Sequence, residues 1–162
     1  MKNKGTKFIT AAAIIAALYV VLTLLANAMG LANFAIQVRF SEALTILPIF
    51  TSAAIPGLFI GCLISNLISG CVIWDIVFGS LATLIGALGT YFLKKYKFLP
   101  FIPPIVANIL IVPFVLVYAY HIEGTLPFFM LTVGIGEVIS CGFLGFFLRR
   151  GLEKYGKHIK WK

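Results

Sequence analysis

Long apolar stretches dominate the chain, and charged residues interrupt them at only a few places. Several windows of about 20 residues carry no charge, which is the length that an α-helix needs to cross the hydrocarbon core of a bilayer. We expect six transmembrane helices, at Lys7–Met29, Phe34–Phe50, Ala54–Ser69, Asp75–Leu93, Phe101–Tyr120 and Leu126–Leu148. The pattern predicts an all-α helix bundle, and the 162 residues form a single membrane domain.

The composition supports this interpretation, since 61% of the residues are hydrophobic and only 11% are charged. A soluble domain of this length needs more polar surface to cover its core. The interior of a bilayer is itself apolar, so a membrane protein does not have this need.

The net charge of +8 comes from cations that flank the apolar segments. Three clusters hold them: Lys2, Lys4 and Lys7; Lys94, Lys95 and Lys97; and Arg149, Arg150, Lys154, Lys157, Lys160 and Lys162. With six crossings and a cytoplasmic N-terminus, all three clusters lie in the cytoplasm, as the positive-inside rule requires. Only Arg39 among the 13 Lys and Arg residues lies elsewhere. We therefore expect both termini to be cytoplasmic and the protein to lie in the cell membrane. The cations face lipid headgroups rather than nucleic acid.

Polar side chains inside the predicted helices are the candidates for a binding site. A charge at the bilayer centre costs roughly 2.5–3.5 kcal/mol, so it usually faces a partner or a cavity. The candidates are Arg39, Glu42, Asp75 and Glu137, with Gln37, Asn66 and Asn108 as neutral companions. Three of them are acidic, which suits a polar solute that is rich in hydrogen-bond donors.

Each candidate also has a purely structural interpretation. Arg39 and Glu42 are three residues apart and can form an ion pair on one helix face. Asp75 can cap the helix that it begins, and Asn108 can join two helices. Glu137 lies near mid-membrane and can be a hydrogen-bonded structural residue.

Small residues on the first helix indicate close helix packing. Ala12 with Ala16 and Ala13 with Ala17 form two small-xxx-small pairs, which let another helix approach. The pattern does not distinguish a helix of this chain from a helix of a partner.

Motifs for chemistry are missing from the sequence. It contains no GxxxxGK[ST] motif, so we expect no ATPase site of its own. Cys62, Cys71 and Cys141 lack CxxC spacing, and His121 and His158 lie outside the predicted helices. We therefore infer no metal site, disulfide, cofactor or catalytic residue, and we expect a protein that is not an enzyme.

Three stretches of the chain resemble one known family. They are QVRFSEALTILPIFTSAAIPGLFIGCLISNLISG at Gln37–Gly70, DIVFGSLATLIGALGTY at Asp75–Tyr91 and LPFFMLTVGIGEVI at Leu126–Ile139. These are similar to the QueT family, the S components (substrate-binding subunits) of energy-coupling factor (ECF) transporters for queuosine precursors. The resemblance implies a transmembrane T component and two ATPase subunits as partners. It also implies that helix 1 docks to the T component through Ala12, Ala13, Ala16 and Ala17, and that the bound subunit rotates in the membrane to release its solute.

The implied solute is 7-aminomethyl-7-deazaguanine or its 7-cyano relative. The two adjacent N–H donors of a guanine-like edge fit one carboxylate, for which Glu137 is the first choice and Glu42 the second. Asp75 then receives the aminomethyl cation, and Asn66 and Asn108 pair with the carbonyl or ring nitrogens. Trp74 either stacks on the ring or anchors the helix at the membrane interface.

Two other classes of function remain open on the sequence. One is a stand-alone secondary carrier that uses Glu137 as its proton site. The other is a small intramembrane enzyme or structural subunit, and the missing nucleophile–base pair disfavours the enzyme.

Overall fold

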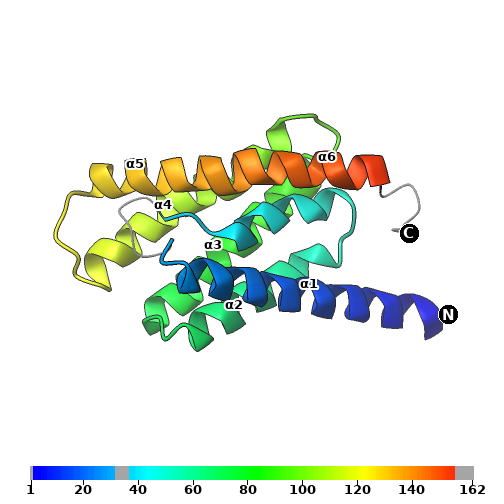
Figure 1. Ribbon diagram of the computed structural model, residues 1–162, viewed down its shortest axis with the longest axis horizontal. Coiled ribbons are helices and arrows are strands. Elements are labelled where there is room, and N and C mark those ends of the chain that lie inside the picture. Colours follow the sequence, from blue (N-terminus) through cyan, green and yellow to red (C-terminus); the bar gives the residue numbers. More distant parts are fainter. Residues whose placement is uncertain (1, 32–36, 156–162) are drawn as a thin grey trace.

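The computed structural model describes residues 2–31 and 37–155 of the chain, and this part is helical without any strand (Figure 1). The elements in order are α1 (Lys2–Ala28), η1 (Phe40–Ile49), α2 (Ala54–Ile68), α3 (Ile73–Phe92), η2 (Leu99–Phe101), α4 (Ile102–Tyr118), α5 (Leu126–Glu137), η3 (Val138–Leu144) and α6 (Gly145–Tyr155). η1 and η2 are 3₁₀-helices and η3 is a π-helix. The prediction of an all-α protein is therefore confirmed.

The helices follow one another around a central segment. α1 packs against α2, α2 against α3, α3 against α4 and α4 against α5. η1, drawn in cyan, lies between α1 and the long rod made by α5, η3 and α6 (Figure 1). Residues 41–48 of η1 are all buried, so this short helix forms the middle of the bundle.

Four helical stretches in the described residues are long and apolar enough to cross a membrane: Lys4–Ala28, Ile73–Phe92, Leu99–Tyr118 and Leu126–Tyr155. The two remaining apolar segments, η1 and α2, are shorter. α2 matches the expected helix at Ala54–Ser69 closely. The expected helices at Asp75–Leu93 and Phe101–Tyr120 also appear, each shifted by one or two residues at its ends.

The expected helix at Phe34–Phe50 differs most from the structure. Residues 34–36 lie outside the described part, residues 37–39 form no helix and lead into an extended Arg39, and a 3₁₀-helix begins only at Phe40. Tertiary partners explain the extended segment, because the N–H of Val38 donates to the Leu31 carbonyl oxygen at 3.3 Å and the N–H of Arg39 to the Ser140 hydroxyl at 3.1 Å. These bonds satisfy donors that a helix would otherwise satisfy internally.

One small-residue pair of α1 is used inside the chain. A Cβ added to Gly57 of α2 would meet the Ala12 carbonyl oxygen at 2.7 Å, and one added to Gly61 would meet the Ala16 carbonyl oxygen at 3.0 Å. α1 and α2 therefore touch through their backbones along this line. Ala13 and Ala17, the next residue after each of these alanines, are exposed. Of the four predicted docking alanines, only these two face away from the bundle.

The last helical rod runs past its predicted end at Leu148 to Tyr155 and contains seven π-helical residues. A π turn inserts one extra residue into an α-helix, and such turns occur frequently at functional sites. Here the wider turn follows Glu137 directly, and both Ser140 and Cys141 within it are buried.

Candidate functional site

A polar cavity of about 360 Å³ opens at the end of the bundle where α1, α2 and α4 finish and α3 begins. Polar side chains predominate among the residues that line it: Thr23, Asn27, Gln37, Arg39, Asn66, Ser69, Cys71, Asp75, Val112, Leu116, Tyr120 and Ile122. Four of them are predicted binding residues: Gln37, Arg39, Asn66 and Asp75. The structure thus brings half of the predicted binding residues to one cavity.

Asp75 is held by groups that the sequence did not connect to it. Its Oδ2 accepts a hydrogen bond from the Tyr120 hydroxyl at 2.9 Å, and the same hydroxyl oxygen accepts the Val72 N–H at 3.3 Å. Val72, not Asp75, is the N-cap residue of α3, so the interpretation of Asp75 as a cap is wrong. Burial and the nearby Asp75 carboxylate raise the pKa of the Tyr120 phenol, which therefore remains a donor.

Asn66 and Arg39 also line the polar cavity. The Asn66 side-chain amide donates to the backbone carbonyl oxygen of Asp75 at 3.4 Å. Arg39 precedes η1 in an extended conformation. Helical spacing therefore does not place Arg39 on the same helix face as Glu42. No ion pair within 4.0 Å joins them among the residues that the structure describes, and the predicted Arg39–Glu42 pair is wrong.

α1 contributes two residues to the cavity. The Thr23 hydroxyl bonds to the Ser41 hydroxyl at 2.8 Å, next to Glu42 in the chain. The Asn27 amide donates to the Ser69 hydroxyl at 2.9 Å, which ties the end of α1 to the end of α2. Thr23 and Ser41 therefore form a polar path from the cavity toward the interior of the bundle.

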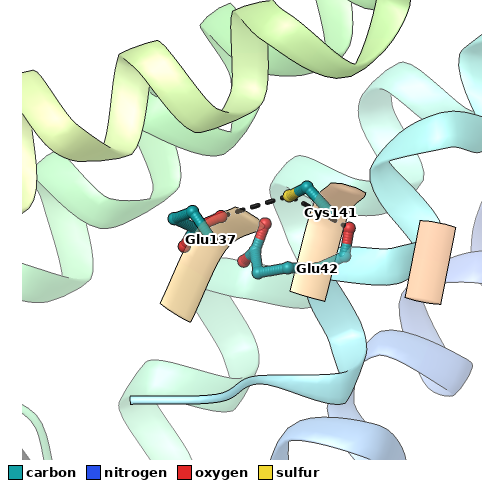
Figure 2. Close-up of side chains that lie close together, drawn as sticks. All are labelled: Glu42, Glu137 and Cys141. Atoms are coloured by element: carbon teal, nitrogen blue, oxygen red, sulfur yellow. Dashed lines mark hydrogen bonds between the residues drawn. The ribbon is translucent and has the colours of Figure 1, made fainter. Parts of the chain in front are cut away.

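A second group of polar residues lies in that interior. Figure 2 shows the side chains of Glu42, Glu137 and Cys141 pointing toward one another. One ligand atom from each lies within 4.8 Å of the other two, and all three residues are buried. Glu42 comes from η1, Glu137 from the end of α5 and Cys141 from η3, so the cluster depends on the contact between η1 and the last helical rod.

Hydrogen bonds hold several of the polar atoms of this cluster. The Cys141 thiol lies 3.1 Å from Glu137 Oε2 and 3.5 Å from the Glu42 carbonyl oxygen. The buried Tyr19 hydroxyl donates to Glu42 Oε1, and Asn108 is buried on α4. Glu42 Oε2 is buried and has no hydrogen-bond partner among the described residues. Such an unpaired buried oxygen is costly unless something else occupies the space beside it.

The three predicted acidic residues therefore divide between two places. Asp75 lines the polar cavity, whereas Glu42 and Glu137 lie close to one another and do not line that cavity. Arg39 joins the two, because it lines the cavity and its backbone N–H donates to the hydroxyl of Ser140, the neighbour of Cys141 in the chain. The prediction of a single cavity for all three carboxylates is replaced by two adjoining polar groups.

Trp74 lies apart from both groups. It is 57% exposed, stacks on Phe78 with ring centroids 6.0 Å apart, and lines an apolar groove with Phe114 and Tyr118. This placement fits the role of an interface anchor and puts the indole outside the polar cavity.

Sequence reasoning missed several residues of these two groups, among them Tyr19, Thr23, Tyr120 and Cys141. Cys141 follows Glu137 by one helical turn, which is a signal that the sequence contains. Tyr19 is separated from Glu42 by 23 positions and Tyr120 from Asp75 by 45, so no local pattern connects these pairs.

Comparison with known proteins gives one clear result. The QueT transporter family matches residues 9–154, which is most of the chain. No curated protein and no solved structure matches it. A family match of this extent, together with the long apolar helices, shows that the chain is a multi-pass membrane protein, a transporter rather than an enzyme, and a member of the QueT transporter family.

Proposed function

We propose that this protein is the S component of an ECF-type importer, and that it captures a queuosine precursor from outside the cell. The observation that carries the proposal is the polar cavity with Asp75, Arg39, Asn66 and Gln37 in its wall. Ligand pockets commonly have volumes of about 300–1,000 Å³, and a cavity of about 360 Å³ suits a small planar molecule.

The distribution of charge supports an outward-facing cavity. Arg149 on α6 donates to the Lys97 carbonyl oxygen, so the basic loop after α3 and the basic end of α6 lie together. α1 begins at this same end of the bundle (Figure 1). The cavity is at the other end, and positive residues remain in the cytoplasm. In this orientation both ends of the chain are cytoplasmic and the cavity opens outward.

Six crossings remain our proposal although η1 and α2 are short. At ~2.0 Å per residue for a 3₁₀-helix and ~1.5 Å for an α-helix, they span about 20 Å and 22 Å, against ~30 Å of hydrocarbon. A short segment is tolerated in a membrane where protein surrounds it. η1 meets that condition, because residues 41–48 are buried.

The cavity offers complementary groups to a deazaguanine. The Asp75 carboxylate accepts the ring N–H and the exocyclic amine together, or it receives the aminomethyl cation. Arg39 donates to the ring carbonyl, and the amides of Asn66 and Gln37 supply both donors and acceptors. Asp75 takes the place that sequence reasoning assigned to Glu137, because Asp75 is the carboxylate that lines the cavity.

The proposed partners are a T component and two ATPase subunits. The exposed Ala13 and Ala17 on α1 support docking of another membrane helix there, because small residues allow close backbone contact. In this proposal the docked subunit rotates within the membrane and releases the solute to the cytoplasm.

Calorimetric titration of the purified protein with both 7-deazaguanines, guanine and an unrelated vitamin tests the proposal. We expect saturable binding of a deazaguanine, and weakening by about 1.5–3 kcal/mol in Asp75→Asn, since a charged hydrogen bond contributes about that much. Glu123→Gln is the matched control, because Glu123 is exposed and does not line the cavity. Absence of deazaguanine binding, or equal affinity in both variants, contradicts the proposal.

The buried carboxyl pair favours a second candidate, a proton-coupled carrier that works alone. This candidate predicts solute uptake by liposomes that contain only this chain and a proton gradient. The S component predicts solute binding but no sustained uptake in the same liposomes until the partner subunits and ATP are added.

A further inference from the structure

We propose that Glu42, Glu137 and Cys141 form a binding site for one divalent transition-metal ion with the preferences of Zn²⁺. The site lies apart from the residues that line the solute cavity, and the inference does not depend on the identity of the solute. Glu137 and Cys141 are four residues apart, but Glu42 comes from η1, far from them in the chain, so sequence spacing did not reveal the set of three.

The geometry of the cluster suits such an ion. Zn²⁺ binds thiolate sulfur at about 2.3 Å and carboxylate oxygen at about 2.0–2.2 Å, so two tetrahedral ligands stand roughly 3.6 Å apart. Cys141 Sγ and Glu137 Oε2 are 3.1 Å apart, and all three ligand atoms lie within 4.8 Å of one another. Small side-chain rotations bring the three atoms to a common distance from one ion.

A separate observation indicates that something belongs in this space. Glu42 Oε2 is buried without a hydrogen-bond partner among the described residues, whereas Glu42 Oε1 is held by Tyr19. An ion beside Oε2 removes the cost of this unpaired oxygen. Tyr19 then acts as the outer hydrogen-bond partner that orients a metal-binding carboxylate.

The choice of metal follows from the ligand types. Ca²⁺ and Mg²⁺ prefer oxygen ligands alone, whereas a thiolate selects softer ions such as Zn²⁺. Two carboxylates and one thiolate carry three negative charges once they bind the ion, and a divalent ion neutralises two of them. Binding requires that Cys141 loses its thiol proton, which passes to the buffer as the sulfur–metal bond forms. Three protein ligands leave a fourth position for water.

Cobalt titration tests the site directly. The full chain is purified without a polyhistidine tag, stripped of metal with a chelator, and titrated with Co²⁺, because cobalt bound to thiolate gives a near-ultraviolet charge-transfer band. We expect a saturable band at one ion per chain, and its loss when Zn²⁺ is added. Asp75→Asn should keep the band even if it loses solute binding, which separates this inference from the proposed function.

Variants then assign the ligands. Cys141→Ser should abolish the band, and Glu42→Gln should weaken Co²⁺ binding at least ~10-fold, since even the loss of an outer partner commonly costs 10- to 100-fold. Cys62→Ser is the matched control, a buried cysteine outside the cluster that should retain the band. A wild-type protein without a thiolate band overturns the proposal and leaves a carboxyl pair that binds only protons. A band that survives Cys141→Ser overturns it as well, and the wild-type titration decides even if this variant fails to fold.

Discussion

Gly136→Ala is the most informative change because two effects of opposite sign compete at this position. Alanine is favoured over glycine inside a helix by about 1 kcal/mol, so helix propensity alone predicts stabilisation. A Cβ at Gly136, however, would overlap the backbone carbonyl oxygen of Gln37. A backbone atom cannot rotate away, so the extended segment at residues 37–39 must move as a whole.

We expect the overlap to outweigh the gain in helix propensity, so that the variant is less stable than the wild type. Overpacking a well-packed site typically costs 1–3 kcal/mol, and the cost is at the upper end where backbone has to shift. After the gain in propensity, we expect a net destabilisation of up to about 2 kcal/mol, or a few degrees in Tm. Because the displaced segment includes Gln37 and Arg39, which line the cavity, solute affinity should fall as well.

Thermal unfolding in detergent and calorimetric titration with the 7-deazaguanine measure the two effects. Gly142→Ala on the same helical rod is the control, because the added Cβ there would lie 3.8 Å from Val138 Cγ1, an ordinary contact. This variant should be as stable as the wild type or slightly more so. If Gly136→Ala matches Gly142→Ala in both Tm and affinity, the close approach of the two backbones does not hold the cavity wall.

Three further predictions concern two hydrogen bonds and two positions on α1. Tyr19→Phe removes the donor to Glu42 and should lower the free energy of unfolding by about 1–3 kcal/mol, measured by thermal or denaturant unfolding; no change would refute the role of this bond. Tyr120→Phe should weaken solute binding. The raised pKa of this phenol means that its contribution to stability is complete below its usual pKa of about 10 and is lost only as pH rises further, which unfolding at several alkaline pH values checks. Ala12→Leu should destabilise the α1–α2 contact, whereas Ala17→Leu should leave the fold intact and reduce co-purification with a T component.

The sequence alone was sufficient to predict an all-α membrane protein. Apolar runs of spanning length predicted the helices, and the positions of the lysines and arginines predicted the orientation, because hydropathy and charge report how a residue partitions between lipid and water. The same reasoning identified Glu42, Asp75 and Glu137 as polar groups that need partners. These inferences depend on one residue or one segment at a time.

Only the tertiary structure decided which partner each of these groups has. The bond of Glu42 to Tyr19, the bond of Asp75 to Tyr120 and the meeting of Glu137 with Glu42 all join distant parts of the chain. The extended segment before η1 also escaped prediction, because its backbone donors bond to Leu31 and Ser140 rather than to its own helix. Hydropathy is a property of a residue, whereas a hydrogen-bond partner is set by the path of the whole backbone, which no local pattern contains.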